Sequence, residues 1–217
     1  MAQLTISLLS LIITATFLVL LPRPITGLND STTTTIKAKE YVEAQCEGTQ
    51  FPITCVQSLT LYVKKTPKSP QELAHIALRV SLFKARSAMA YMKFVVEQVN
   101  KTSSNRPDVY LAVKECYNQI SDGVYQLHMS LGEIEKIDRG GKAGFMWHMS
   151  NIDSWISSAW TETSTCVDNF PSRAMGGKVK ATIRAKVVNV GESISNAQAL
   201  FNRFVSKHRV TGAEAKP

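Results

Sequence analysis

The sequence lacks the motifs that mark common catalytic sites. Its 217 residues contain no Gly-x-Ser-x-Gly elbow and no glycine-rich phosphate loop. The pairs Gly140-Gly141 and Gly176-Gly177 are expected to be linkers, and no acidic residue falls on the apolar stripes described below, where burial could raise its pKa. We therefore predict no catalytic residue, and a binding protein rather than an enzyme.

The signature of a carboxylate-bridged metal centre, which helical bundles can hold, is also missing. Such a centre needs two Glu-x-x-His motifs, and only Glu72-Leu73-Ala74-His75 has that form. No Glu stands three positions before His128, His148 or His208. Glu72 and His75 are therefore expected to be a surface pair on the first turn of a helix, and no metal or other cofactor is predicted.

No apolar run reaches the roughly 20 residues that a membrane-spanning helix needs. The run from Leu8 to Leu21 has 14 residues and ends at Pro22. This length is typical of a signal peptide, although Met1 to Ser7 contain no Lys or Arg. We expect a signal peptide over residues 1–27, a mature chain over 28–217 with no membrane segment, and a loose threonine-rich start at Ser31 to Thr35. The alternative is an uncleaved anchor.

Acidic residues are fewer than basic ones, at 17 Asp and Glu against 25 Lys and Arg, so the formal charge is +8. An excess of positive charge favours acidic partners, which include nucleic acid, anionic lipid, acidic polysaccharide and acidic protein. Export disfavours nucleic acid. The remaining composition, with 44% apolar residues, is that of one globular domain.

Cysteine is scarce, but the four residues present are an even number in a chain expected to be exported. An oxidising compartment favours disulfides, and Cys46, Cys55, Cys116 and Cys166 allow three connectivities. Sequons at Asn29 and Asn100 also fit a secreted chain, and both are candidate glycosylation sites.

Strand-like alternation is absent as well, and the apolar residues recur at helical spacing. Four long stripes of this kind run from Leu73 to Phe94, Val113 to Ile134, Met149 to Phe170 and Ile183 to Phe204. The first has Ser69 as its N-cap and Pro70 as its first helical residue, and its predicted core positions are Leu73, Ile76, Val80, Phe83, Ser87, Ala90 and Phe94. Short links between the stripes predict an all-α, up-down-up-down four-helix bundle over about residues 70–207.

A helical hairpin over about residues 34–66 is expected before the bundle, with helices at 37–45 and 53–65. A Cys46–Cys55 bond would staple this hairpin and stabilise it by roughly 2.7 kcal/mol in the chain-entropy model. Cys116 and Cys166 then pair by elimination, and that bond contributes about 4 kcal/mol. The other two connectivities, which would tie the hairpin across the bundle, remain open.

Several motifs around the cysteines resemble the plant invertase/pectin methylesterase inhibitor family. The segment Ala112 to Tyr117, followed by Asp122 to Leu127, is similar to the helix that carries the family's third cysteine. Trp155 to Phe170 is similar to the helix that carries its fourth, and Glu43 to Cys46 with Pro52 to Cys55 match its hairpin bridge. The resemblance covers about residues 34–207.

The resemblance implies a first-with-second and third-with-fourth disulfide pairing. It also implies a non-catalytic protein of the plant cell-wall space, the apoplast, which binds a pectin methylesterase or an acid invertase in a one-to-one complex and occludes its substrate cleft. Some invertase inhibitors have a Pro-Lys-Phe element after the fourth cysteine, where this chain has Phe170-Pro171-Ser172. The absence of that element favours pectin methylesterase as the target, with acid invertase as the alternative.

Two polar rows are the candidates for the contact surface. The first recurs at helical spacing opposite a core stripe and is rich in hydroxyl groups, which have little side-chain entropy to lose; it consists of Ser154, Ser158, Thr161, Thr165 and Asp168. The resemblance adds weight to Thr165, which directly precedes the fourth cysteine. The second row holds an exposed Tyr and Met, types enriched at interfaces; it consists of Asn118, Asp122, Tyr125 and Met129. An ordinary solvated face is the alternative for both.

A basic wall-structural or pectin-binding protein is the competing hypothesis from another class. It is motivated by the net charge and by a basic run formed by Lys178, Lys180, Arg184 and Lys186. Weak association with pectin is expected in either case, because pectin is a polyanion.

Overall fold

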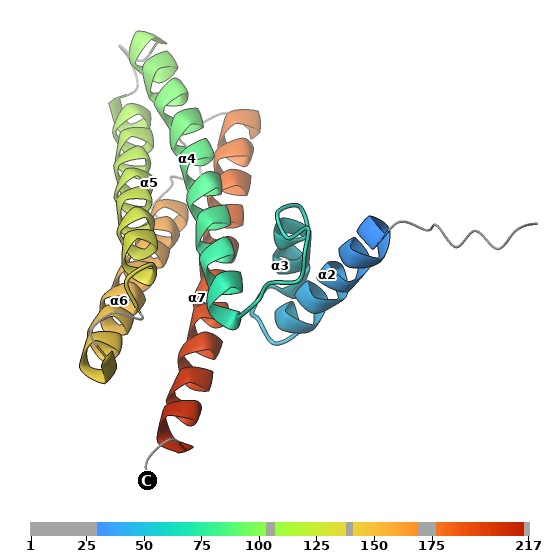
Figure 1. The fold of residues 1–217 in the computed structure, drawn as a ribbon. Helices are drawn as coiled ribbons and strands as arrows, with labels where there is room; N and C mark the ends of the chain where they lie inside the picture. Colours follow the sequence, from blue (N-terminus) through green and yellow to red (C-terminus); the bar gives the residue numbers. More distant parts are fainter. Residues whose placement is uncertain (1–29, 103–106, 138–140, 169–176, 215–217) are drawn as a thin grey trace, which may run out of the picture. The chain divides into compact units, whose positions relative to one another are not determined.

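Every regular element of the part of the chain that the structure describes is an α-helix (Figure 1). The computed structural model describes residues 30–102, 107–137, 141–168 and 177–214. The helices are α2 (Asp30–Cys46), α3 (Pro52–Leu59), α4 (Pro70–Thr102), α5 (Pro107–Ile134), α6 (Gly141–Asp168) and α7 (Gly177–Glu214). The predicted signal peptide, the sequon residue Asn29 and Phe170 lie outside the described residues.

The four long helices form the predicted bundle. α4 packs against α5 and α7, and α6 packs against the same two neighbours, so α4 and α6 lie at opposite corners. Consecutive helices are joined by short connections and run alongside one another (Figure 1), which is the up-down-up-down arrangement. α7 continues to Glu214, beyond the expected end of the bundle near residue 207.

Three of the four predicted core stripes are confirmed among the described residues. On α5 the stripe centres on Leu127, on α6 it centres on Ile156, and on α7 it includes Phe201, all of which are fully buried. The three helices therefore present to the core the faces that their 3-4 spacing predicts.

The predicted stripe of α4 is wrong in its phase. Leu73 and Val80 are buried, but Phe83 is 60% exposed and Phe94 is 56% exposed, and Ser87 and Ala90 also face outward. The buried face is rich in alanine, and it consists of Leu73, Ala74, Ala77, Leu78, Val80, Ser81, Leu82, Ala85, Ala88, Met92 and Val95. Small residues let the backbone of α4 approach α5 and α7 closely, whereas two phenylalanines on that face would hold the helices apart.

The disulfide pairs are Cys46 with Cys55 and Cys116 with Cys166, as the family resemblance implied. The hairpin boundaries differ from those expected. α2 begins at Asp30 rather than near residue 37, and the threonine-rich stretch that was expected to be loose forms the first turns of this helix. α3 ends at Leu59 rather than near residue 65, and the following turn brings Val63 into the core, where it is 3% exposed.

Polar side chains attach this hairpin to α7. The amide of Asn196, which is 3% exposed, accepts a hydrogen bond from the Phe51 backbone N–H and donates one to its carbonyl, at 3.1 and 2.9 Å. Lys84 of α4 donates to the hydroxyls of Ser58 and Ser193 at 2.6 and 2.8 Å, and its burial lowers the pKa of its ammonium group. These contacts join α3, α4 and α7 at one place in the fold.

The N-terminus of α4 follows the sequence prediction. Ser69 caps the helix by accepting a hydrogen bond from the Glu72 N–H at 3.1 Å, and Pro70 is the first helical residue. The Glu72 carboxylate accepts a hydrogen bond from the Lys68 N–H, and His75 lies 3.7 Å from Glu135. Among the described residues, no group of three His, Cys, Asp or Glu side chains is placed to hold a metal ion.

Candidate partner-binding surface

Three contacts align α5 and α6 side by side along their lengths. Cys116 is bonded to Cys166 near one end, and Glu133 accepts a hydrogen bond from His148 near the other. Between them Gly123 faces the backbone of Ala159, where a Cβ atom would lie 3.6 Å from the carbonyl oxygen. The close approach of the two helices makes their outward faces one continuous surface.

The hydroxyl row on α6 faces outward, as the sequence predicts. Ser154, Ser158, Thr161 and Asp168 are exposed, and Thr165 is half-buried. Three of the hydroxyls donate to the carbonyl four residues earlier in the helix, at 2.9 to 3.0 Å; the donors are Ser154, Thr161 and Thr165. These bonds fix the side-chain rotamers and leave each oxygen able to accept a hydrogen bond from outside.

The second row lies on α5 and is also on the surface. Asn118 and Asp122 are exposed, Tyr125 is 59% exposed, and Met129 is half-buried. The three contacts between α5 and α6 fix the register of the two antiparallel helices. In this register Asn118 lies level with Thr165, Asp122 with Thr161 and Tyr125 with Ser158. The two rows, considered separately in the sequence, therefore form a single surface, which we call the α5–α6 surface.

Sequence reasoning missed an acidic group on this surface. Burial and the nearby carboxylates of Asp122 and Glu115 raise the pKa of the Glu162 carboxyl group. Asp122 and Glu115 come from α5 and Glu162 comes from α6, so only the pairing of these helices brings the three together. The surface is locally acidic although the chain as a whole is basic.

Two large exposed side chains extend the rows and were also missed. Trp147 is 67% exposed and stands seven positions before Ser154 on α6, whereas Leu111 is 61% exposed and stands seven positions before Asn118 on α5. A seven-residue step returns to the same helix face, so continuing the 3-4 spacing outward would have found both. Large apolar groups thus flank the small hydroxyl row.

Glu133 is a buried carboxyl group, although it lies on none of the predicted apolar stripes. Its side chain is 10% exposed and accepts hydrogen bonds from His148 at 2.8 Å, Asn151 at 3.0 Å and Lys136 at 3.3 Å. Burial alone would raise the pKa of this carboxyl group, but the three hydrogen bonds outweigh burial and leave the pKa below its ordinary value. The cluster fastens α5 to α6 beneath the surface.

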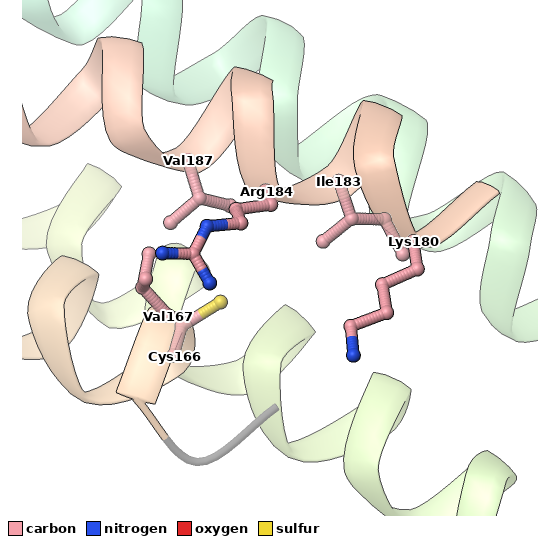
Figure 2. Close-up of a pocket in the computed structure, with 6 residues that line it drawn as sticks. All are labelled: Cys166, Val167, Lys180, Ile183, Arg184 and Val187. Atoms are coloured by element: carbon pink, nitrogen blue, oxygen red, sulfur yellow. The ribbon is translucent and has the colours of Figure 1, made fainter. Parts of the chain in front are cut away.

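A narrow cleft lies at the disulfide end of α6, where Ile183 and Val187 of α7 face Cys166 and Val167 (Figure 2). Lys180 and Arg184 also line it, and its free space of about 10 Å³ is no larger than a single water molecule needs. This cleft is therefore too small for an organic ligand.

The predicted basic run does not form one patch. Lys180 and Arg184 face α6, whereas the Lys186 ammonium lies 5.4 Å from the ring centroid of Tyr91 on α4. The residues of this run thus point to two sides of α7. The second sequon residue, Asn100, is exposed in the last turn of α4.

The fold and its surface define an all-α protein in which two disulfides secure a hairpin and a four-helix bundle. The family model for the plant invertase/pectin methylesterase inhibitor matches residues 40–200, so the chain belongs to this family. None of its described helices is long and apolar enough to cross a membrane.

Named relatives agree with this assignment. The chain is 38% identical to pectinesterase inhibitor 9 of Arabidopsis thaliana over 89% of its own length and 95% of that protein. It is 38% identical to pectinesterase inhibitor 11 of the same plant over 81% and 85%, and 36% identical to a 21 kDa protein of Daucus carota over 79% and 87%.

A solved structure has the same fold. A crystal structure of a mutant form of a pectin methylesterase inhibitor from Arabidopsis superposes with a TM-score of 0.58 and 14% identity, and the match covers 73% of this chain and 93% of that one. At this identity the likeness concerns the fold alone.

Proposed function

We propose that the protein inhibits pectin methylesterase by laying the α5–α6 surface over the substrate cleft of the enzyme. The observation that carries this proposal is the union of the hydroxyl row and the Tyr125 row on one surface. Family membership and the names of the relatives support the target. In the plant wall, such inhibition regulates the de-methylesterification of pectin.

The chemistry of the surface suits a protein partner. Its centre consists of short hydroxyl side chains that are already fixed by hydrogen bonds to their own helix, so that little conformational entropy is lost on binding. Tyr125 and Trp147 stand nearby as large exposed side chains of the kind that anchor interfaces. A helix pair with short hydroxyl side chains beside exposed aromatic groups can approach a cleft closely and cover it.

The acidic group on the α5–α6 surface favours a partner with positive charge at the point of contact. Glu115, Asp122 and Glu162 lie close enough to interact, and bringing Lys or Arg from an enzyme against them would relieve their mutual repulsion. We therefore expect the rim of the inhibited cleft to be basic where it meets this group.

The proposal also covers the location and composition of the protein. The chain is a secreted, non-catalytic protein of the apoplast with a signal peptide over residues 1–27, and it acts in a one-to-one complex. It uses no cofactor and binds no nucleic acid, and Asn29 and Asn100 are candidate glycosylation sites. Acid invertase is the alternative target, because the family includes inhibitors of both enzymes.

The direct test is a titration of the oxidised mature protein into a plant pectin methylesterase and, separately, into a plant acid invertase at acidic pH. We expect loss of esterase activity near equimolar inhibitor. Loss of invertase activity alone would establish the alternative target, and inhibition of neither across several isoforms of each enzyme would refute the proposal.

A further inference from the structure

The outward face of α4 carries an exposed apolar row that the bundle does not use. Its exposed members are Phe83, Ala90 and Phe94, with Ser87 between the two phenylalanines, and half-buried Ile76 lies at one end against the core. Its two phenylalanines are 60% and 56% exposed. Two large aromatic side chains on one solvent-facing row of a helix are unusual unless something binds there.

A row of cations runs beside the apolar row. Arg79, Arg86 and Lys93 are exposed and follow one another at seven-residue steps, so they share one side of the helix. From Arg79 to Lys93 the row spans about 21 Å of the helix axis. No Asp or Glu occurs between Glu72 and Glu97, so this stretch of α4 carries positive charges and no negative charge of its own.

The apolar row opens into a groove at one end. The ring of Tyr62, from the segment between α3 and α4, lies edge-on to Phe83 with 6.4 Å between ring centroids. Together with Ile76, Arg79 and Val80 these rings line a groove of about 320 Å³. The groove thus combines two aromatic rings with the first cation of the row, and it is large enough for a sugar ring.

We propose that this face of α4 binds an acidic polysaccharide chain built from uronic acids. A pyranose ring presents apolar C–H groups on its faces, which pack against aromatic rings, and a uronate carboxylate pairs with the planar guanidinium of arginine. Tyr62 and Phe83 hold one sugar in the groove while Arg79 binds its carboxylate. Arg86 and Lys93 bind carboxylates further along the same chain.

The charge pattern selects this occupant over a second copy of the protein. Two α4 helices packed antiparallel on this face would bring Arg86 of each copy near Lys93 of the other, and these like charges would repel. A linear polyanion instead meets each cation in turn. The concave groove fits a ring better than it fits the flat surface of a lipid bilayer.

The site is separate from the α5–α6 surface. α4 contacts α5 and α7, and α6 occupies the opposite corner of the bundle, so an enzyme seated on the hydroxyl row leaves the outer face of α4 open. The inference does not rest on the proposed function. If both hold, the inhibitor attaches to pectin whose carboxylates have been freed while its other face closes the enzyme that frees them.

Calorimetric titration of the mature protein with unesterified oligogalacturonate of about ten residues, in about 0.15 M salt and without enzyme, tests the inference. We expect saturable binding to the acid and at least about tenfold weaker binding to the fully methyl-esterified oligomer, because the ester removes the negative charge. Equal binding of acid and ester would overturn the assignment of the ligand.

Matched variants separate this site from diffuse attraction. Phe83→Ser retains every charge and should weaken binding about five- to tenfold, and Arg79→Gln should do the same. Leu111→Ser removes an apolar group on α5 that is as exposed as Phe83, and Arg184→Gln removes an exposed cation on α7. Each variant should change binding less than about twofold. If Phe83→Ser has no effect and both arginine variants weaken binding equally, the attraction is that of net charge alone and the α4 site is excluded.

Discussion

The carboxylate of Glu133 on α5 lies 2.8 Å from Nδ1 of His148 on α6, in a position where the carboxylate is almost fully buried. Asn151 and Lys136 complete its hydrogen bonds. This cluster and the Cys116–Cys166 bond hold the two ends of the helix pair whose outer faces form the proposed inhibitory surface.

Replacing Glu133 should therefore loosen the helix pair. Glu133→Ala removes the acceptor that His148 and Asn151 share, and we expect a loss of about 2 kcal/mol in the free energy of unfolding, measured by urea denaturation at about pH 7. Glu135→Ala is the control, because that side chain is 67% exposed and should change stability by less than about 0.5 kcal/mol. Equal losses in both variants would contradict this account of the cluster.

The same residue gives stability a defined pH dependence. The pKa of Glu133 is lower in the folded protein than in the unfolded chain, so its stabilisation is complete above the ordinary pKa of glutamate and is lost as the pH falls through the lowered folded value. The stability of wild type should fall more steeply than that of Glu133→Gln between about pH 5 and pH 3. Parallel pH profiles for the two proteins would exclude this contribution.

A charge placed on the hydroxyl row should abolish inhibition without affecting the fold. Thr161→Arg and Thr165→Arg each introduce a long side chain where close approach is proposed, and we expect at least about a hundredfold loss of inhibition of the target enzyme with unchanged helical circular dichroism. Ser206→Arg serves as the control, because it places the same side chain at an exposed position on α7, away from the hydroxyl row. Full inhibition by both threonine variants would remove this row from the proposed interface.

The attachment of the hairpin to α7 should depend on one amide. Asn196→Ala leaves the Phe51 N–H and carbonyl without their partner, and we expect a loss of about 2 kcal/mol in the free energy of unfolding. Asn202→Ala, at an exposed position on the same helix, should have little effect. Amide hydrogen exchange at Phe51 provides a second readout, since its protection should decrease only in the first variant.

The two disulfides should differ in what they protect. Removing the bond of α5 to α6 with Cys116→Ala and Cys166→Ala should cost about 4 kcal/mol and reduce inhibition, because the two rows lose their alignment. Removing the hairpin bond with Cys46→Ala and Cys55→Ala should cost about 2.7 kcal/mol and leave the α5–α6 surface in place. Urea denaturation and enzyme titration of both double variants check this, and the reverse order of effects on inhibition would contradict it.

Much of the fold and part of the candidate site follow from the order of residues. Helices α5, α6 and α7 each carry large apolar residues on one face and polar residues on the opposite face, so only the apolar face of each helix can be buried. The same contrast places Thr161 and Tyr125 on the outside, where the structure has them. Ser69 and Pro70 set the start of α4 through local chemistry alone.

Helix α4 shows where this reasoning fails. It has apolar residues on two faces, and a sequence reading favours the face with the larger ones, which includes Phe83 and Phe94. The choice between the faces depends on how closely α5 and α7 approach, and only the alanine-rich face, with Ala77 and Ala85, permits the observed packing. The distance between α4 and its two neighbours is set only when the bundle is assembled.

The sequence by itself determined the helices, their short connections and the outward direction of the polar rows, because these depend on neighbours within one or two helical turns. Tertiary structure alone decided which rows share a surface, how Glu162 comes to lie beside Asp122, why Glu133 is buried and which face of α4 remains open. Each of these depends on contacts between residues far apart in the chain, and helical periodicity carries no information about such contacts.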